Sequence, residues 1–112
     1  MFVAKEKEIG ETEVSEKDVK GVRMKILLGE SQGASNFVMR VFEIEPGGHT
    51  AYHTHPWEHE VYVLEGNGAV RQDGKDHELV KGSVVLVKPN EPHQFLNKGR
   101  EAFKFICVVP IV

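Results

Sequence analysis

The fold of this chain is set by one short stretch, Gly47-Gly48-His49-Thr50-Ala51-Tyr52-His53-Thr54-His55-Pro56-Trp57-Glu58-His59-Glu60. Successive side chains of an extended strand point to opposite faces, so the rings of His53 and His55 share one face. Pro56 cannot donate to a strand ladder, so we expect a break there, after which His59 turns inward with the first pair. Imidazole is the commonest side-chain metal ligand, and the spacing therefore predicts three ligands of one metal ion.

A fourth histidine, His93, ends a second stretch, Gly82-Ser83-Val84-Val85-Leu86-Val87-Lys88-Pro89-Asn90-Glu91-Pro92-His93. Pro89 and Pro92 restrict the turn before His93, which favours a preformed position for a ligand. A distant histidine completes a site only where the fold brings two strands together. Four of the six histidines fall in these two stretches, and isolated surface or core histidines would not explain that grouping. The pattern predicts a metal centre inside a β-barrel.

Three other polar residues lie close to these histidines in sequence or share their type. His49 has the same strand parity as His53, so we expect it at the mouth of a pocket or in solvent. His77 follows Lys75-Asp76, and we expect it at a solvated hairpin tip. Glu60 points away from the ligand face by parity, so we expect it not to bind the ion, but to accept a hydrogen bond from a ligand imidazole or to be solvated.

Short apolar segments separated by turn residues make up the rest of the chain. Regular short strands with such punctuation indicate an all-β sandwich or barrel. The segment 36–45 is apolar on both faces, which in so small a chain favours subunit contact and predicts a homodimer. The expected strands are 22–28, 37–45, 61–65, 84–87 and 103–109.

Length and composition fit one folded domain of 112 residues, with 40% apolar and 28% charged residues. We expect an N-terminal extension over 1–18 and a barrel over 19–112. The net charge is −3 and no basic stripe occurs, so we expect no nucleic-acid partner. No apolar run reaches membrane-spanning length and the N-terminus is charge-rich, so we expect no membrane partner and a cytoplasmic location. The single cysteine, Cys107, excludes an internal disulfide.

The first stretch resembles a motif of the cupin superfamily of small jelly-roll barrels. That motif runs Gly, five residues, His-x-His, three or four residues, Glu, six residues, Gly. Gly47, His53, His55 and Gly66 match it, but the position counted back from Gly66 is His59 instead of a glutamate. The resemblance therefore implies a fourth histidine where the family usually has a carboxylate.

The second stretch resembles the other cupin motif, which runs Gly, five residues, Pro-x-Gly, two residues, His, three residues, Asn. Gly82, His93 and Asn97 match, while Lys88 replaces the proline and Asn90 replaces the glycine. Asparagine tolerates the left-handed backbone that such a glycine supplies, so we expect the turn to survive. Paired motifs of this kind are highly specific, and the resemblance covers roughly residues 20–110.

The resemblance implies a cupin-type double-stranded β-helix (jelly-roll) barrel. The chain is also similar to small single-domain cupins with a four-histidine manganese centre, through Asn36–Arg40, Glu45–Gly48, His55–Glu60 and Cys107–Pro110. That similarity implies one divalent ion per chain, with Mn²⁺ favoured and Fe²⁺, Zn²⁺, Ni²⁺ or Cu²⁺ as alternatives. Four neutral imidazoles would leave the site near the ion's own charge and strengthen its Lewis acidity. The implied ligands are His53, His55, His59 and His93.

Further residues are candidates for the pocket wall. Phe95 shares a face with the histidine two residues before it, and Phe105 and Cys107 lie where the similar cupins place wall residues. The alternative for Cys107 is a small buried hydrophobe. Arg40, if it faces inward, is able to hold an anionic substrate, and its alternative is an ion pair at a dimer interface. Trp57 is expected at the entrance or at the subunit contact.

Three functions remain open at this point. The first is a metal-dependent dioxygenase or other oxidoreductase that acts on a small organic substrate, because the similar cupins resemble enzymes that cleave alkenyl carbon–carbon bonds. The second is a non-catalytic module that binds a small carboxylate or a sugar. The third is a metal-dependent sugar isomerase or epimerase. A pocket wall rich in Phe and Val favours the first function.

Overall fold

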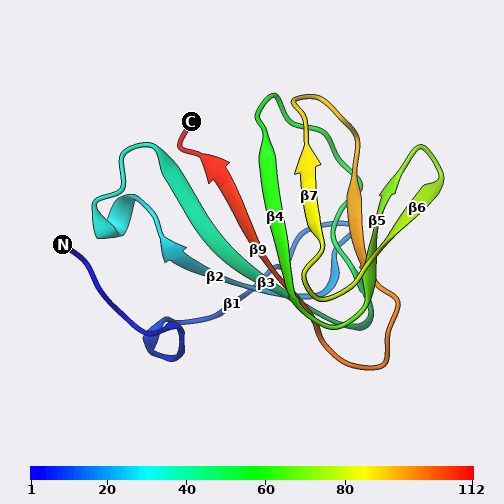
Figure 1. Cartoon of the computed structure of the whole chain (residues 1–112), viewed down its shortest axis with the longest axis horizontal. Helices are drawn as coiled ribbons and strands as arrows, with labels where there is room; N and C mark the ends of the chain where they lie inside the picture. The colour runs from blue at the N-terminus through cyan, green and yellow to red at the C-terminus, as the bar shows by residue number, and fades with distance from the viewer.

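The computed structural model describes all 112 residues, and its regular structure is almost entirely β-strand (Figure 1). Two single 3-10 turns, η1 (Glu6–Glu8) and η2 (Glu30–Gln32), are the helical segments, and neither has the length and apolar character needed to cross a membrane. The strands are β1 (Thr12–Glu13), β2 (Lys20–Leu28), β3 (Phe37–His49), β4 (His59–Glu65), β5 (Gly68–Gln72), β6 (Lys75–Leu79), β7 (Val84–Val87), β8 (Gln94–Asn97) and β9 (Phe103–Pro110).

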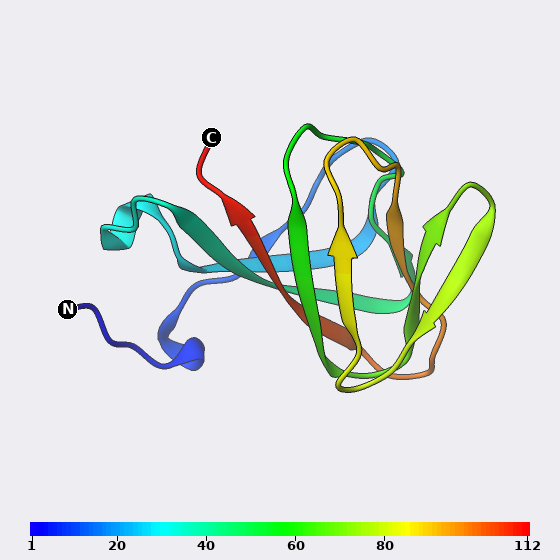
Figure 2. The same cartoon turned by 45° about the horizontal axis from the view of Figure 1, so that its top comes forward.

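All strand pairs are antiparallel and form one sheet with the order β6-β5-β8-β3-β9-β4-β7, to which β2 and β1 add beside β3. The long strand β3 pairs with β9 along Phe37–Ile44 and with β8 at His49, so it belongs to both layers of the fold. The sheet curls until its two end strands, β6 and β7, face each other (Figure 2). This is the all-β jelly-roll barrel that the sequence predicts.

Side chains that alternate along β9 fill the barrel. Phe103, Phe105, Cys107 and Val109 are buried, and the residues between them are only half-buried, as the two-residue period of a strand requires. Gly66 fits this packing because its φ is +85° and a Cβ there would collide with the carbonyl oxygen of Ala102. The closed turn before β5 therefore depends on glycine.

The five expected strands are present, but four short strands, β1, β5, β6 and β8, were missed and the long strand β3 was cut short. The hairpin β5–β6 is too polar along Lys75–Leu79 to show an apolar alternation, and β8 has four residues. The expected strand over 37–45 ends before Pro46-Gly47-Gly48, whereas β3 continues through these residues to His49. A register shift between β2 and β3 and a φ of +80° at Gly47 let the strand pass this point.

The first residues of the chain pack on the same sheet. The carboxylate of Glu6 lies 2.9 Å from the Nζ of Lys104 and 3.7 Å from that of Lys25. Strand β1 pairs with β2, and the side chains of Val14 and Val19 pack against the core. The expected boundary between an extension over 1–18 and a barrel over 19–112 stays a prediction.

Candidate metal centre

His53 and His93 are placed side by side by their own backbones. The amide of His53 donates to the carbonyl of His93 at 3.1 Å, and the amide of His93 donates back to His53 at 3.0 Å. This isolated bridge is the only ladder contact of the His-x-His segment. We predicted that His53 and His55 lie within a strand, and the structure places them outside the regular strands. The two ring centroids are 4.8 Å apart.

His55 is positioned by the turn that precedes His93. The amide of Asn90 donates to the carbonyl of His55 at 2.8 Å. Asn90 has a φ of +68°, so asparagine supplies the left-handed backbone of the glycine that the motif usually contains, as predicted. The side chain of Asn97, the last motif residue, donates to the carbonyls of Ile44 and Glu101 at 2.8 Å and holds the far end of β8.

Three histidines converge on one point. The possible ligand atoms of His53, His55 and His93 all lie within 4.8 Å of one another. His93 is buried, His55 is half-buried and His53 is exposed at the edge of the group. Ring nitrogens at such mutual distances are able to surround a single metal ion.

Hydrogen bonds to backbone carbonyls set the tautomers of two of these rings. Nδ1 of His55 lies 3.0 Å from the carbonyl oxygen of Trp57, and Nδ1 of His93 lies 2.9 Å from that of Glu91. A carbonyl only accepts, so each Nδ1 carries the proton and each Nε2 presents a lone pair. Both Nε2 atoms are buried without a hydrogen-bond partner. Buried polar atoms rarely lack a partner, and a cation would satisfy both.

His59 begins β4 and lies against the same group without joining it fully. Its ring centroid is 4.2 Å from that of His55 and 5.2 Å from that of His93. The side chain is buried, and its Nδ1 has no hydrogen-bond partner. The nitrogens of His59 are nevertheless outside the set that lies within 4.8 Å. The structure therefore brings three of the four predicted ligands together and leaves the fourth beside them.

Desolvation favours the neutral form of three of these imidazoles, those of His53, His59 and His93. Desolvation, with a smaller contribution from the charges of His55 and His93, lowers the pKa of His59 to about 3. Desolvation also lowers the pKa of His93, although the carbonyl of Glu91 opposes that shift. At the edge of the group, partial desolvation and the charge of His55 lower the pKa of His53. Neutral imidazole is the form that binds a metal ion, so the site is prepared for one at neutral pH.

A cavity of about 230 Å³ opens beside the rings, and we call it the histidine cavity. The candidate pocket residues Arg40, Phe95, Phe105 and Cys107 all line it. No aspartate, glutamate, lysine or tyrosine does. The four histidines line it too, and the remaining lining residues are Phe42, Thr50, Trp57, Val109, Pro110 and Val112.

Two residues of this cavity have roles that the sequence did not reveal. The indole of Trp57 stacks on the ring of His55, with centroids 4.7 Å apart and planes 5° from parallel, so the residue supports a histidine by both its ring and its carbonyl. The hydroxyl of Thr50 accepts from the amide of Phe95 at 2.9 Å and extends the contact of β3 with β8. Neither role follows from spacing, because each depends on a loop conformation.

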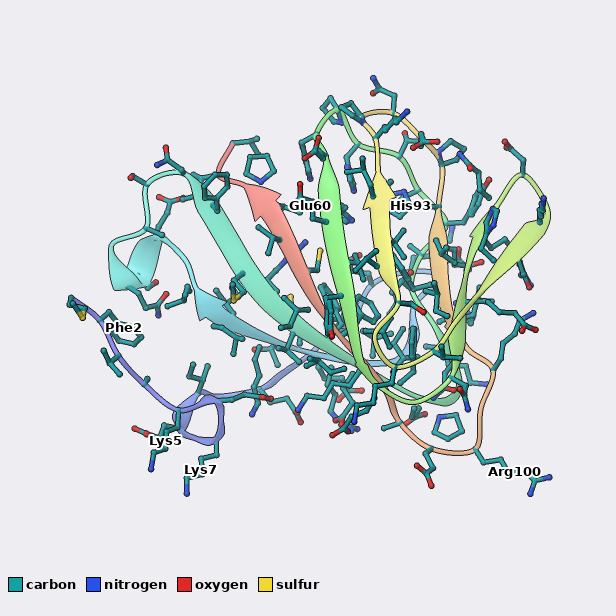
Figure 3. All side chains as sticks on the ribbon, viewed as in Figure 1. Phe2, Lys5, Lys7, Glu60, His93 and Arg100 are labelled. Atoms are coloured by element: carbon teal, nitrogen blue, oxygen red, sulfur yellow. The ribbon has the colours of Figure 1, made fainter.

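Three polar residues lie outside the histidine cavity. His49 is half-buried, and its Nδ1 lies 3.1 Å from the carbonyl oxygen of Thr50. His77 is exposed, as predicted, but within β6 opposite Val70 and not at the hairpin tip. Glu60 is exposed on β4, and it lies at the same end of the barrel as His93 (Figure 3).

A family model for the cupin domain matches residues 40–109, which is more than half of the chain. Among curated proteins, an uncharacterised protein of Methanocaldococcus jannaschii is 34% identical over 62 residues, or 54% of this chain and 50% of that protein. An oxalate-binding protein of Thermotoga maritima is 31% identical over 68 residues, or 60% of this chain and 56% of that protein. The chain thus matches about half the length of these relatives.

Two solved structures resemble the whole chain. The polyketide cyclase RemF from Streptomyces resistomycificus has a TM-score of 0.93 at 31% identity, with 98% of this chain and 79% of that chain covered. A predicted oxalate decarboxylase from Thermotoga maritima has a TM-score of 0.86 at 28% identity, with 99% of this chain and 100% of that chain covered. These likenesses cover the barrel and the segments that bear the histidines.

Proposed function

This chain belongs to the cupin family, and from that premise we propose that it is a metal-dependent enzyme of the oxygenase type. Its single divalent ion would be held by His53, His55, His59 and His93, with Mn²⁺ the favoured ion. The observation that carries the proposal is the convergence of His53, His55 and His93 with two lone pairs, on His55 and His93, that have no partner. The small organic substrate would occupy the histidine cavity.

The donor set fits a divalent ion. Two Nε2 lone pairs are oriented by carbonyls on the opposite ring nitrogens, which is the usual arrangement around metal-binding histidines. Nδ1 of His59 is a third buried atom without a partner, and we propose that this ring supplies the fourth nitrogen. A bound divalent ion would supply a Lewis acid and, if it is Mn²⁺ or Fe²⁺, a redox centre.

The rest of the cavity supports redox or Lewis-acid chemistry over isomerisation. An isomerase or epimerase needs a residue that takes a proton from the substrate. Apart from the histidines, Arg40 and Cys107 are the ionisable side chains that line the cavity. Burial raises the pKa of the Cys107 thiol, and arginine does not lose its proton. If the four imidazoles bind the ion, no general base remains, so the chemistry would have to come from the ion.

Metal content tests the proposal independently of activity. Protein is depleted with a chelator, dialysed against Mn²⁺, Fe²⁺ or Zn²⁺ and then freed of unbound ion. Inductively coupled plasma mass spectrometry should then find one ion per chain. The Glu60→Gln variant should retain it as well, because Glu60 is exposed on the other face of β4. Oxygen or peroxide consumption with a small aryl alkene then tests the reaction class. Absence of a bound ion at micromolar concentrations would refute the proposal.

A non-catalytic binding function is the second candidate, because one relative is an oxalate-binding protein. The two candidates share the ion and differ in turnover. Binding of a small acid without consumption of oxygen or peroxide, in protein loaded with a redox-active ion, would favour the binding function.

We also propose that the protein is a homodimer, formed through the outer face of β4, β7 and β9. Tyr62, Val84 and Leu86 are exposed there by 50%, 73% and 53%, and Ile106 and Val108 line the same shallow apolar groove. Contiguous exposed apolar surface of this kind is typical of a contact site. Light scattering should give twice the chain mass at micromolar concentration, and Leu86→Glu should give a monomer. A monomeric wild type would contradict this proposal.

A further inference from the structure

Arg40 lines the histidine cavity without a counter-ion. It lies in β3 opposite Cys107 of β9, and its Nη2 donates to the sulfur of Cys107 at 3.4 Å. Its Nε is buried and has no partner. By contrast, Arg23 and Arg71 each lie 2.6 Å from a carboxylate oxygen. Arg40 is thus a cation whose donors are largely unused.

Nothing in the cavity neutralises this charge. No acidic side chain lines it, and sulfur is a weak acceptor. Burial raises the pKa of the Cys107 thiol, which keeps that group uncharged at neutral pH. The ring of Phe42 lies 5.0 Å from the guanidinium carbon and compensates only part of a full charge. A poorly paired charge in an apolar cavity is unfavourable, and an anionic ligand would relieve it.

We propose that the histidine cavity takes a small organic carboxylate whose apolar body is aromatic or alkenyl, with the carboxylate on Arg40. This proposal names the substrate class of the proposed function. A reaction of the bound acid depends on that proposed function, whereas binding of the acid to Arg40 does not. A guanidinium offers a planar fork of donors that matches a carboxylate. The anion would also be attracted by the positive charge of an ion held by neutral imidazoles.

The aromatic wall of the cavity, which begins beside Arg40 at Phe42, fits the apolar body. The rings of Phe95 and Phe105 have centroids 4.8 Å apart, and those of Phe42 and Phe105 are stacked at 5.5 Å, so they form one continuous aromatic surface. A volume of about 230 Å³ corresponds to about eight water molecules at their volume in the liquid. Such a space suits a compact planar acid and excludes a large polyphosphate or an oligosaccharide.

Strand geometry argues against an ion pair between Arg40 and a partner subunit across the outer sheet face. Successive side chains of β3 alternate, so Met39 and Val41 are on the face opposite to Arg40. Their strand partners are Val108 and Ile106, which belong to the outer apolar face. A subunit packed on that face would lie on the side of β3 away from the guanidinium and would not reach it.

Binding of matched acids and amides to metal-free protein tests the inference. We would titrate phenylacetate and trans-cinnamate, and then phenylacetamide and cinnamamide, by calorimetry or by NMR shifts. Each acid should bind at least about tenfold more tightly than its amide, because only the acid forms charge-assisted hydrogen bonds with Arg40. Equal affinities of acid and amide, or binding of neither, would overturn the inference.

Variants assign the preference to Arg40. Arg40→Met should abolish the preference for acids, and Arg40→Lys should keep part of it, since lysine retains the charge but not the fork. Arg100→Met is the matched control, because Arg100 is exposed at the end of the barrel opposite to His93 (Figure 3). A full preference in Arg40→Met would refute the role of this residue. If Arg40→Met does not fold, Arg40→Lys and the wild-type comparison decide.

The two proposals fail separately. Protein that prefers acids over amides but retains no ion would refute the metal-dependent function and keep the inference about Arg40. Protein that retains one ion but binds acids and amides equally, both before and after loading with redox-inert Zn²⁺, would refute the inference and keep the metal site.

Discussion

The barrel has two hollows beside His93, and they differ in the state of their polar groups. The histidine cavity has about 230 Å³ and an aromatic wall. The second hollow, which we call the seam groove, has about 490 Å³ and lies between the end strands β6 and β7, where it is lined by Gln72, His77, Glu78 and Glu91. The larger and more polar hollow therefore lies away from most of the converging histidines.

The difference lies in hydrogen bonding. In the seam groove the amide of Gln72 donates to the carboxylate of Glu91 at 3.2 Å, and that carboxylate also accepts from the amide of Lys88 at 2.8 Å. By contrast, the four buried side-chain nitrogens that lack a partner all belong to residues of the histidine cavity: Arg40, His55, His59 and His93. Unused donors and lone pairs distinguish a candidate binding site from a mere hollow better than volume does.

Substitution of one histidine in each hollow should give the largest difference in metal affinity between the two hollows. His93→Ala should weaken the binding of a divalent ion about a hundredfold. In structural zinc sites with about four ligands, each ligand contributes about 3 kcal/mol to the binding free energy. His77→Ala in the seam groove should bind as the wild type does. Calorimetric titration with Zn²⁺ measures both. Equal losses in the two variants would place the ion elsewhere.

Metal loading should stabilise the fold through the histidine cavity alone. An ion at one hundred times its dissociation constant adds about 2.7 kcal/mol to the free energy of unfolding, because the unfolded chain cannot assemble the rings. For a domain of this size the midpoint of thermal unfolding should rise by about 10 °C. Thermal denaturation with and without a chelator measures the shift. The shift should persist in His77→Ala and fall to about 2 °C in His93→Ala, for which the same ion concentration equals only about one dissociation constant.

Acid should destabilise the metal-free protein through the buried histidines. Burial lowers the pKa of His59 from an ordinary value near 6.5 to about 3. Between these values the unfolded chain binds a proton that the folded chain does not, so the stability is complete above pH 6.5 and is lost as the pH falls. At pH 5 the loss from His59 is about 2 kcal/mol.

Urea unfolding in a chelator at pH 7.5 and at pH 5 measures this loss. His59→Gln should show a smaller loss of stability between the two pH values than the wild type, because no buried imidazole has to be protonated at that position. His77→Gln, which changes an exposed histidine of the seam groove, should keep the wild-type difference. An unchanged difference in His59→Gln would show that His59 titrates normally.

A change confined to the seam groove should have the smallest effect. Gln72→Ala removes the hydrogen bond to Glu91 and should lower the free energy of unfolding by about 1 kcal/mol. Its affinity for Zn²⁺ should remain within about twofold of the wild type. A large loss of metal affinity would show that the two hollows are coupled through the turn that precedes His93.

The sequence predicted the elements whose cause is local. Alternation along 103–109 predicted a strand with Phe105 and Cys107 on one face, and the replacement of a motif glycine by Asn90 predicted a left-handed turn residue. Local rules failed where the signal was weak or misleading. The polar hairpin of β5 and β6 lacks apolar alternation, and the strand expected over 37–45 stops before Gly47 although β3 passes through it.

The sequence by itself determined the residue types of the site and the more apolar of the strands that surround it, because strand period, turn preference and motif spacing act over a few residues. Only the tertiary structure decided which groups meet. The bridge between His53 and His93 joins segments far apart in the chain, and the pairing of His59 with Val87 of β7 places His59 beside the converging rings and not among them. The sequence also could not predict that Arg40 lacks a counter-ion, because this depends on every side chain that the closed barrel brings to the cavity.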